Sequence, residues 1–77
     1  MFILSQDKKN LAEYRKIYIQ KNWGGKKGNK SVLIGDVLHA FSSSIVLGMY
    51  ADQEEAVAEL GRICEAMKNG DTVYAVK

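Results

Sequence analysis

The stretch "ADQEEAVAELGRICEAMKNG", residues 51–70, decides the fold class because it carries the full pattern of an amphipathic helix. Asp52 is a natural N-cap residue, and Glu55 three positions later completes a capping-box pattern. Lys68 suits the last turn, and Gly70 supplies a left-handed stop. The sequence therefore predicts one helix that begins after Asp52 and ends before Gly70.

This helix is predicted to have one apolar face toward the core. The apolar residues at three- and four-residue steps are Val57, Leu60, Ile63, Cys64 and Met67. Cys64 is expected in the core rather than as a nucleophile. The acidic residues at its start, Glu54, Glu55 and Glu59, are interpreted as a solvated face. Gly61, which costs roughly 1 kcal/mol relative to alanine in a helix, is expected where the helix approaches a sheet closely.

Strand-like segments surround the helix. They cover residues 1–5, 13–23, 31–41, 42–51 and 71–77. The segment 31–41 also has apolar spacing that suits a helical turn, but its β-forming residues and Gly35 favour a strand. The order of four strands, one helix and one strand predicts an α+β fold: a small, mostly antiparallel sheet with one amphipathic helix packed on one face.

Side chains alternate across a strand, so residues 13–23 predict two different faces. Ile17 and Ile19 are expected on one face, and Tyr14, Lys16 and Tyr18 on the other.

Size and composition set further limits. A chain of 77 residues forms one domain, 1–77, with a small core, and its single cysteine allows no internal disulfide. One histidine, His39, excludes a Cys/His zinc cluster, so we expect no metal. Because a core this small is marginal, we expect the chain to associate into a homodimer, which would add stability. No apolar run is long enough to span a membrane and no secretion leader is evident, which together with a free thiol indicates the cytoplasm.

Charge is divided unevenly along the chain. Residues 1–30 carry eight basic side chains against two acidic ones, a net charge of +6, and residues 31–77 carry a net charge of −4. This division indicates an anionic partner for the first part, or complementarity between subunits.

The segment "NWGGKKGNKS", residues 22–31, comes close to the phosphate-binding pattern G-x-x-x-x-G-K-[ST]. Asn29 stands where the second glycine is required, and a strand rather than a helix is expected to follow, so both features argue against a nucleotide-hydrolysing loop. Two interpretations remain. One is a solvated hairpin loop; the other is an electropositive loop that grips phosphate or an acidic protein. The residues of that binding site would be Lys16, Trp23, Lys26, Lys27 and Lys30.

Other features are typical of a known group of proteins. The first strand ends in Ser5-Gln6-Asp7, and "LGMY", residues 47–50, precedes Glu54 and Ala56. These features resemble small proteins, mostly of unassigned function, that are encoded by phages and prophages of Gram-positive bacteria, with an "ISQD"-type start and a later LG-x-Y-x-x-x-E-x-A motif. The resemblance covers about half of the chain and implies a shared fold more than a shared activity.

No serine, histidine and carboxylate arrangement indicates catalysis, so we expect a protein that is not an enzyme and needs no cofactor. The phage resemblance implies a protein that inhibits a host factor in the host cytoplasm. The target would be a defence-system component, held by direct binding or deprived of a phosphate-bearing signal nucleotide. A nucleic-acid-binding module that uses the basic part is one alternative, and a structural or assembly subunit is another.

Overall fold

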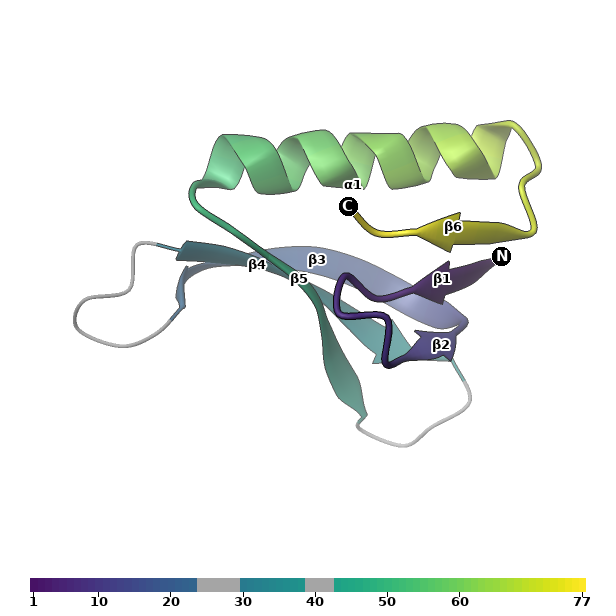
Figure 1. Cartoon of the computed structure of the whole chain (residues 1–77), viewed down its shortest axis with the longest axis horizontal. Coiled ribbons are helices and arrows are strands. Elements are labelled where there is room, and N and C mark those ends of the chain that lie inside the picture. The colour runs from purple at the N-terminus through teal and green to yellow at the C-terminus, as the bar shows by residue number, and fades with distance from the viewer. Residues whose placement is uncertain (24–29, 39–42) are drawn as a thin grey trace.

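The computed structural model describes residues 1–23, 30–38 and 43–77 (Figure 1). In chain order the elements are β1 (Phe2–Leu4), β2 (Leu11–Ala12), β3 (Tyr14–Trp23), β4 (Lys30–Val37), β5 (Ser44–Tyr50), α1 (Gln53–Lys68) and β6 (Val73–Ala75). The fold is α+β with one helix packed on small, mostly antiparallel sheets, as predicted. The segment 31–41, which suited either a strand or a helical turn, forms the strand β4 over Lys30–Val37.

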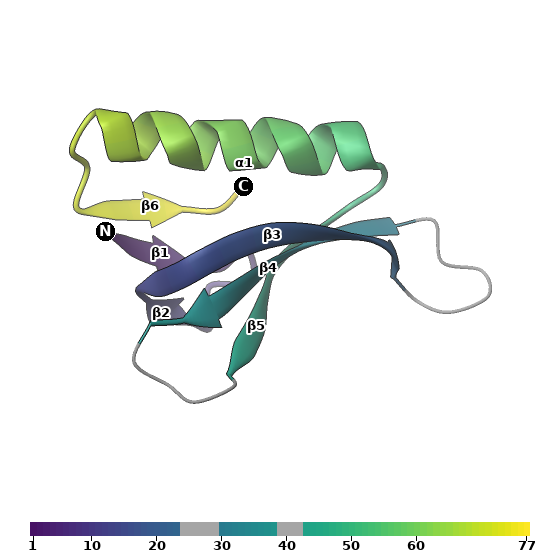
Figure 2. The same cartoon turned by 180° about the vertical axis from the view of Figure 1, so that it is seen from behind.

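The strands form two sheets of three strands rather than one sheet. One has the order β3-β4-β5 with both pairs antiparallel, and the other has the order β2-β1-β6. In the second sheet β2 is a short strand that was not expected, and β6 lies parallel to β1. The helix supplies the crossover that a parallel return of the chain requires. Both views show α1 along one side of the molecule, with β6 between α1 and β1 (Figures 1 and 2).

The ends of α1 match the sequence prediction. The Asp52 side chain accepts a hydrogen bond from the Glu55 backbone N–H at 2.9 Å. At the other end Gly70 has a φ of +75°, its N–H donates to the carbonyl of Met67, and the Asp71 N–H donates to that of Ala66. These two bonds define a Schellman motif, so glycine is needed at this position.

The face of α1 that packs against the sheets overlaps the predicted stripe only in part: Ile63 is buried and Leu60 packs against the core, as predicted. The helical residues that are buried are Ala56, Glu59, Ile63 and Ala66. Cys64 is exposed, so its expected place in the core is wrong, and Val57 and Met67 are 50% and 57% exposed. Small alanines allow the helix to approach the sheets, and the buried face is turned by roughly a quarter of a revolution from the predicted stripe.

Two further expectations about α1 are corrected. Glu59 was expected on a solvated face, but its side chain is fully buried. Gly61 was expected at a close approach to a sheet, but a Cβ at this position would meet no atom within 4 Å. Gly61 therefore lies on the outer side of the helix.

A bulge in β3 changes which side chains face the core. Tyr14 pairs with Val37 while Lys16 pairs with Asp36, so β3 has one extra residue at this point. The extra residue shifts the alternation of faces, and Tyr14 packs against the core together with Ile17 and Ile19. The expectation that Tyr14 lies on the face opposite these isoleucines is therefore wrong.

The core lies between α1 and the two sheets. Its buried residues are Ile3, Leu33, Leu47, Tyr50, Ala56, Ile63 and Val76. Every layer contributes, since these residues belong to β1, β4, β5, α1 and the segment after β6. Packing between α1 and the sheets leaves two surfaces that could bind another molecule.

Candidate functional site

Three of the predicted phosphate-binding residues are described by the structure: Lys16 and Trp23 in β3, and Lys30 in β4. Lys26 and Lys27, like His39, lie outside the described residues. Trp23 pairs with Lys30 at the end of the hairpin, and the description of Trp23 is limited to its backbone. Lys16 and Lys30 are both exposed, and the ammonium of Lys16 lies 5.1 Å from the centre of the Tyr18 ring, a cation–π distance.

Strand register separates the two lysines that the structure describes. Lys16 lies opposite Asp36 on β4, six residues along that strand from Lys30. At about 3.3 Å per residue, the two backbone positions are roughly 20 Å apart. Lys16 and Lys30 of one chain therefore cannot hold the same phosphate group.

Lys16 instead borders a groove between β3 and α1. The groove has a volume of about 310 Å³. Its lining residues are Tyr14, Arg15, Lys16 and Ile17 from β3, and Leu60, Ile63, Cys64 and Met67 from α1. Most of these side chains are apolar, and Arg15 and Lys16 add two positive charges. In Figure 2 the strand β3 runs in front, directly below α1.

The groove runs along an edge of a sheet. In the order β3-β4-β5, the ten-residue strand β3 is at the edge, and among residues 1–23, 30–38 and 43–77 its strand partner is β4 alone. An edge strand presents unpaired backbone N–H and C=O groups to which another extended segment can bind. Arg15, Lys16 and Lys21 are the charged residues of β3, and all are basic.

The opposite edge of the same sheet is partly closed by Gln6. The Gln6 backbone N–H donates to the carbonyl of Leu47 on β5 at 2.7 Å, and the Gln6 side-chain carbonyl accepts from the Met49 N–H at 2.9 Å. One residue thus occupies backbone groups of β5 on both sides of Gly48. The two edges of this sheet therefore differ in how far they are open to a partner.

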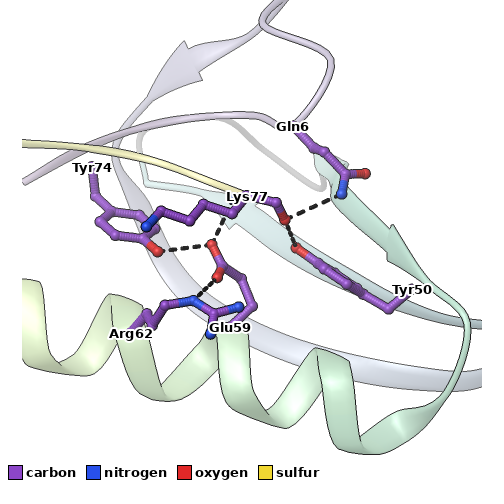
Figure 3. Close-up of polar contacts among 6 residues, drawn as sticks. All are labelled: Gln6, Tyr50, Glu59, Arg62, Tyr74 and Lys77. Carbon is purple, nitrogen blue, oxygen red and sulfur yellow. Dashed lines mark hydrogen bonds and ion pairs between the residues drawn. The ribbon is translucent and has the colours of Figure 1, made fainter.

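The second candidate is a polar cluster around Glu59, shown in Figure 3. The buried Glu59 carboxylate accepts hydrogen bonds from the Tyr74 hydroxyl at 2.9 Å, from the Lys77 backbone N–H at 2.8 Å, and from the Arg62 side chain. A buried carboxylate is tolerated only when it is paired and hydrogen-bonded in this way. Both oxygens are occupied, so the cluster holds structure together and offers no free base.

The same cluster fixes the segment after β6. The carbonyl of Lys77 accepts hydrogen bonds from the Tyr50 hydroxyl at 3.0 Å and from the Gln6 side-chain amide at 3.2 Å. Gly48 leaves the space for Tyr50, because a Cβ there would lie 2.5 Å from the Tyr50 oxygen. The Ser5-Gln6-Asp7 and LGMY motifs therefore meet at this segment, which assigns a structural role to both.

Burial and hydrogen bonds shift the pKa values of groups in and near the cluster. Burial, supported by the nearby Glu59 charge, raises the pKa of Tyr50 to about 12. Burial and the bond to Glu59 also raise the pKa of Tyr74, and the same carboxylate raises the pKa of Arg62. In the turn after β1, the Ser5 hydroxyl and the Lys9 N–H lower the pKa of Asp7. Tyr50 and Tyr74 are thus neutral, and Arg62 charged, at neutral pH.

A depression of about 470 Å³ borders this cluster. Its polar walls include Gln6, Glu55, Arg62 and Lys77, so both signs of charge are present. Mixed charge on a shallow surface selects no single class of ligand. The groove between β3 and α1 combines an apolar floor, one sign of charge and an open strand edge, and it is therefore the better candidate for a binding site.

Sequence reasoning missed Glu59 and the groove. Ala56, Glu59, Ile63 and Ala66 are spaced by three or four residues, a helical pattern that contains one carboxylate among small and apolar side chains. That pattern is the signal for a buried Glu59. The groove has no such signal, because the bulge in β3 and the rotation of α1 create it.

Comparison with known proteins finds no matching family model, no significantly similar curated protein and no significantly similar solved structure. Among the described residues, no helix is long and apolar enough to cross a membrane. Within that same part of the chain, no three His, Cys, Asp or Glu side chains are grouped so that they could hold a metal ion.

Proposed function

We propose that this chain is a non-enzymatic phage or mobile-element protein that binds a host protein directly and inhibits it, the target being a defence-system component. The observation that carries the proposal is the groove between β3 and α1, where apolar side chains and two cations lie beside an open strand edge. Such a surface suits recognition of another polypeptide. The phage origin rests on the Ser5-Gln6-Asp7 and LGMY motifs alone.

Direct protein binding is preferred over capture of a signal nucleotide. The predicted nucleotide site relies on Lys16 and Lys30 together, and the register places these two residues of one chain about 20 Å apart. In contrast, Arg15 and Lys16 are adjacent and line one groove. The other predicted phosphate-binding lysines, Lys26, Lys27 and Lys30, are tested separately below.

The test is capture of a partner from a lysate of a Gram-positive host, followed by an assay of the captured factor with and without this protein. We expect one dominant host protein, and loss of its activity on addition of a molar equivalent. Changing Met67 to glutamate should abolish capture, because Met67 lines the groove. Val57→Glu is the matched control, since Val57 is a similarly exposed apolar residue of α1 outside the groove.

Three results would contradict parts of the proposal. Capture of a partner whose activity is unchanged would favour a structural or assembly subunit. Loss of capture in a triple Lys26→Glu, Lys27→Glu, Lys30→Glu variant, with capture by Met67→Glu unaffected, would assign the binding site to the segment 22–31 instead of the groove. Retention of nucleic acid alone, in a manner that weakens steeply with salt, would favour the nucleic-acid-binding alternative.

A further inference from the structure

We infer that the groove between β3 and α1 receives an extended, acidic segment of the partner protein, which pairs with β3 as a fourth strand of the β3-β4-β5 sheet. This inference rests on the proposed function and specifies the chemistry of the partner. Three features of the described residues carry it: the open edge of β3, the form of the groove, and the sign of its charges.

The open edge provides the main-chain part of recognition. The strand β3 extends over ten residues, Tyr14–Trp23, and within the described part of the chain β4 is its strand partner. On the other edge of the sheet, Gln6 already bonds to Leu47 and Met49. Backbone donors and acceptors on the outer edge of β3 are therefore available to an added strand. Fewer such groups are available on β5.

The groove provides pockets for side chains. An added strand directs alternate side chains to the same side of the sheet. On the side of the sheet next to α1, the helix residues Leu60, Cys64 and Met67 line the groove beside β3. The volume of about 310 Å³ lies at the small end of ligand pockets, which span about 300–1,000 Å³. It fits a few apolar side chains of a peptide rather than a folded domain.

Charge determines which segment binds. The strand β3 carries Arg15, Lys16 and Lys21 and no acidic residue. A second copy of β3 would bring two basic strands together, and like charges on paired strands destabilise a sheet. An acidic strand would neutralise them. A second copy of this chain is therefore the poorer occupant of this edge, although a homodimer through another surface stays a prediction.

The experiment selects binders to the intact chain from a displayed library of random twelve-residue peptides. We expect enrichment of peptides in which Asp or Glu alternates with β-branched or aromatic residues, without a central proline. Cys64 is the single cysteine and lines the groove, so a bound synthetic peptide should protect it from maleimide. A central proline should weaken binding about fivefold to tenfold, because it removes a main-chain hydrogen-bond donor.

Charge reversal provides the sharpest comparison. The double variant Arg15→Glu, Lys16→Glu should bind the selected peptide at least about tenfold more weakly, and replacing the acidic residues of the peptide by lysine should restore binding. The matched control is Lys8→Glu, Lys9→Glu, which makes the same change in net charge at two exposed residues outside the groove.

Several outcomes would overturn the inference: no enriched peptide, enriched peptides without acidic residues, unprotected Cys64 in the complex, or preferential protection of Cys64 by DNA or RNA.

Failure of the proposed function gives a different pattern of results. A captured host protein that the peptide does not displace would sink the inference and leave the function intact. Peptides that bind as expected, with no host protein captured or inhibited, would sink the function and leave the inference intact.

Discussion

The Tyr74 hydroxyl donates a hydrogen bond of 2.9 Å to the carboxylate of Glu59, which is fully buried under the segment that follows β6. This pair joins the middle of α1 to the last strand of the chain. The contact matters because β6 is three residues long and, within the described residues, has β1 as its strand partner. Side-chain hydrogen bonds therefore fix the end of the chain against the helix.

Replacement of Glu59 by glutamine should lower the free energy of unfolding by about 1–3 kcal/mol. Tyr74 and Lys77 donate to one carboxylate oxygen and Arg62 donates to the other, whereas an amide keeps only one accepting oxygen, so its NH₂ group faces a donor and a charge-assisted bond is lost inside a buried site. Urea unfolding measures the change. Glu54→Gln, at an exposed position of the same helix, should stay within about 0.5 kcal/mol. Equal effects of the two substitutions would show that Glu59 is solvated.

Stability should fall in alkaline solution because of Tyr50. Folding raises the pKa of Tyr50 from its ordinary value of 10.0 to about 12. A raised pKa means that the folded state holds the proton more tightly, so this contribution is complete below pH 10 and is lost as pH rises toward about 12. Urea unfolding at a series of pH values should therefore give a shallower decline for Tyr50→Phe than for the wild type. Parallel curves would contradict the proposed burial of the phenol.

Gly61→Ala should stabilise the protein by roughly 0.5–1 kcal/mol. Alanine is the better helix residue, and its Cβ would meet no atom within 4 Å. The contrasting substitution is Gly48→Ala, whose Cβ would press on the Tyr50 hydroxyl that binds Lys77. That change should cost about 1–3 kcal/mol through overpacking. Thermal unfolding of both variants measures the two changes in stability. A loss of stability in Gly61→Ala would show that this position contacts a neighbouring residue.

Tyr14→Phe should leave stability unchanged or raise it by up to about 1 kcal/mol. The Tyr14 hydroxyl is buried without a hydrogen-bond partner in the described part of the chain, and an unpaired buried hydroxyl is costly. Tyr74→Phe removes a hydroxyl that is bonded to Glu59, and it should instead cost about 1–3 kcal/mol. Chemical unfolding should thus show a lower free energy of unfolding for Tyr74→Phe and an unchanged or higher one for Tyr14→Phe. A clear loss of stability in Tyr14→Phe would show that its hydroxyl is bonded in solution.

The amino-acid sequence by itself determined the local elements of this protein. Asp52, Glu55 and Gly70 define the ends of α1 because capping is a matter of a few neighbouring residues. Alternation and β-forming residues identified every strand of the described residues except β2, for the same local reason. The α+β class followed from the order of these elements.

Tertiary structure alone decided which faces those elements bury. The register of β3 against β4 places a bulge at Tyr14 and Lys16, and close packing at Ala56 and Ala66 rotates α1. These events bury Glu59 and expose Cys64. They depend on contacts between residues far apart in the chain, where small differences in packing volume outweigh the apolar pattern of one segment. The groove beside β3 is a product of that packing and has no counterpart in any single stretch of the sequence.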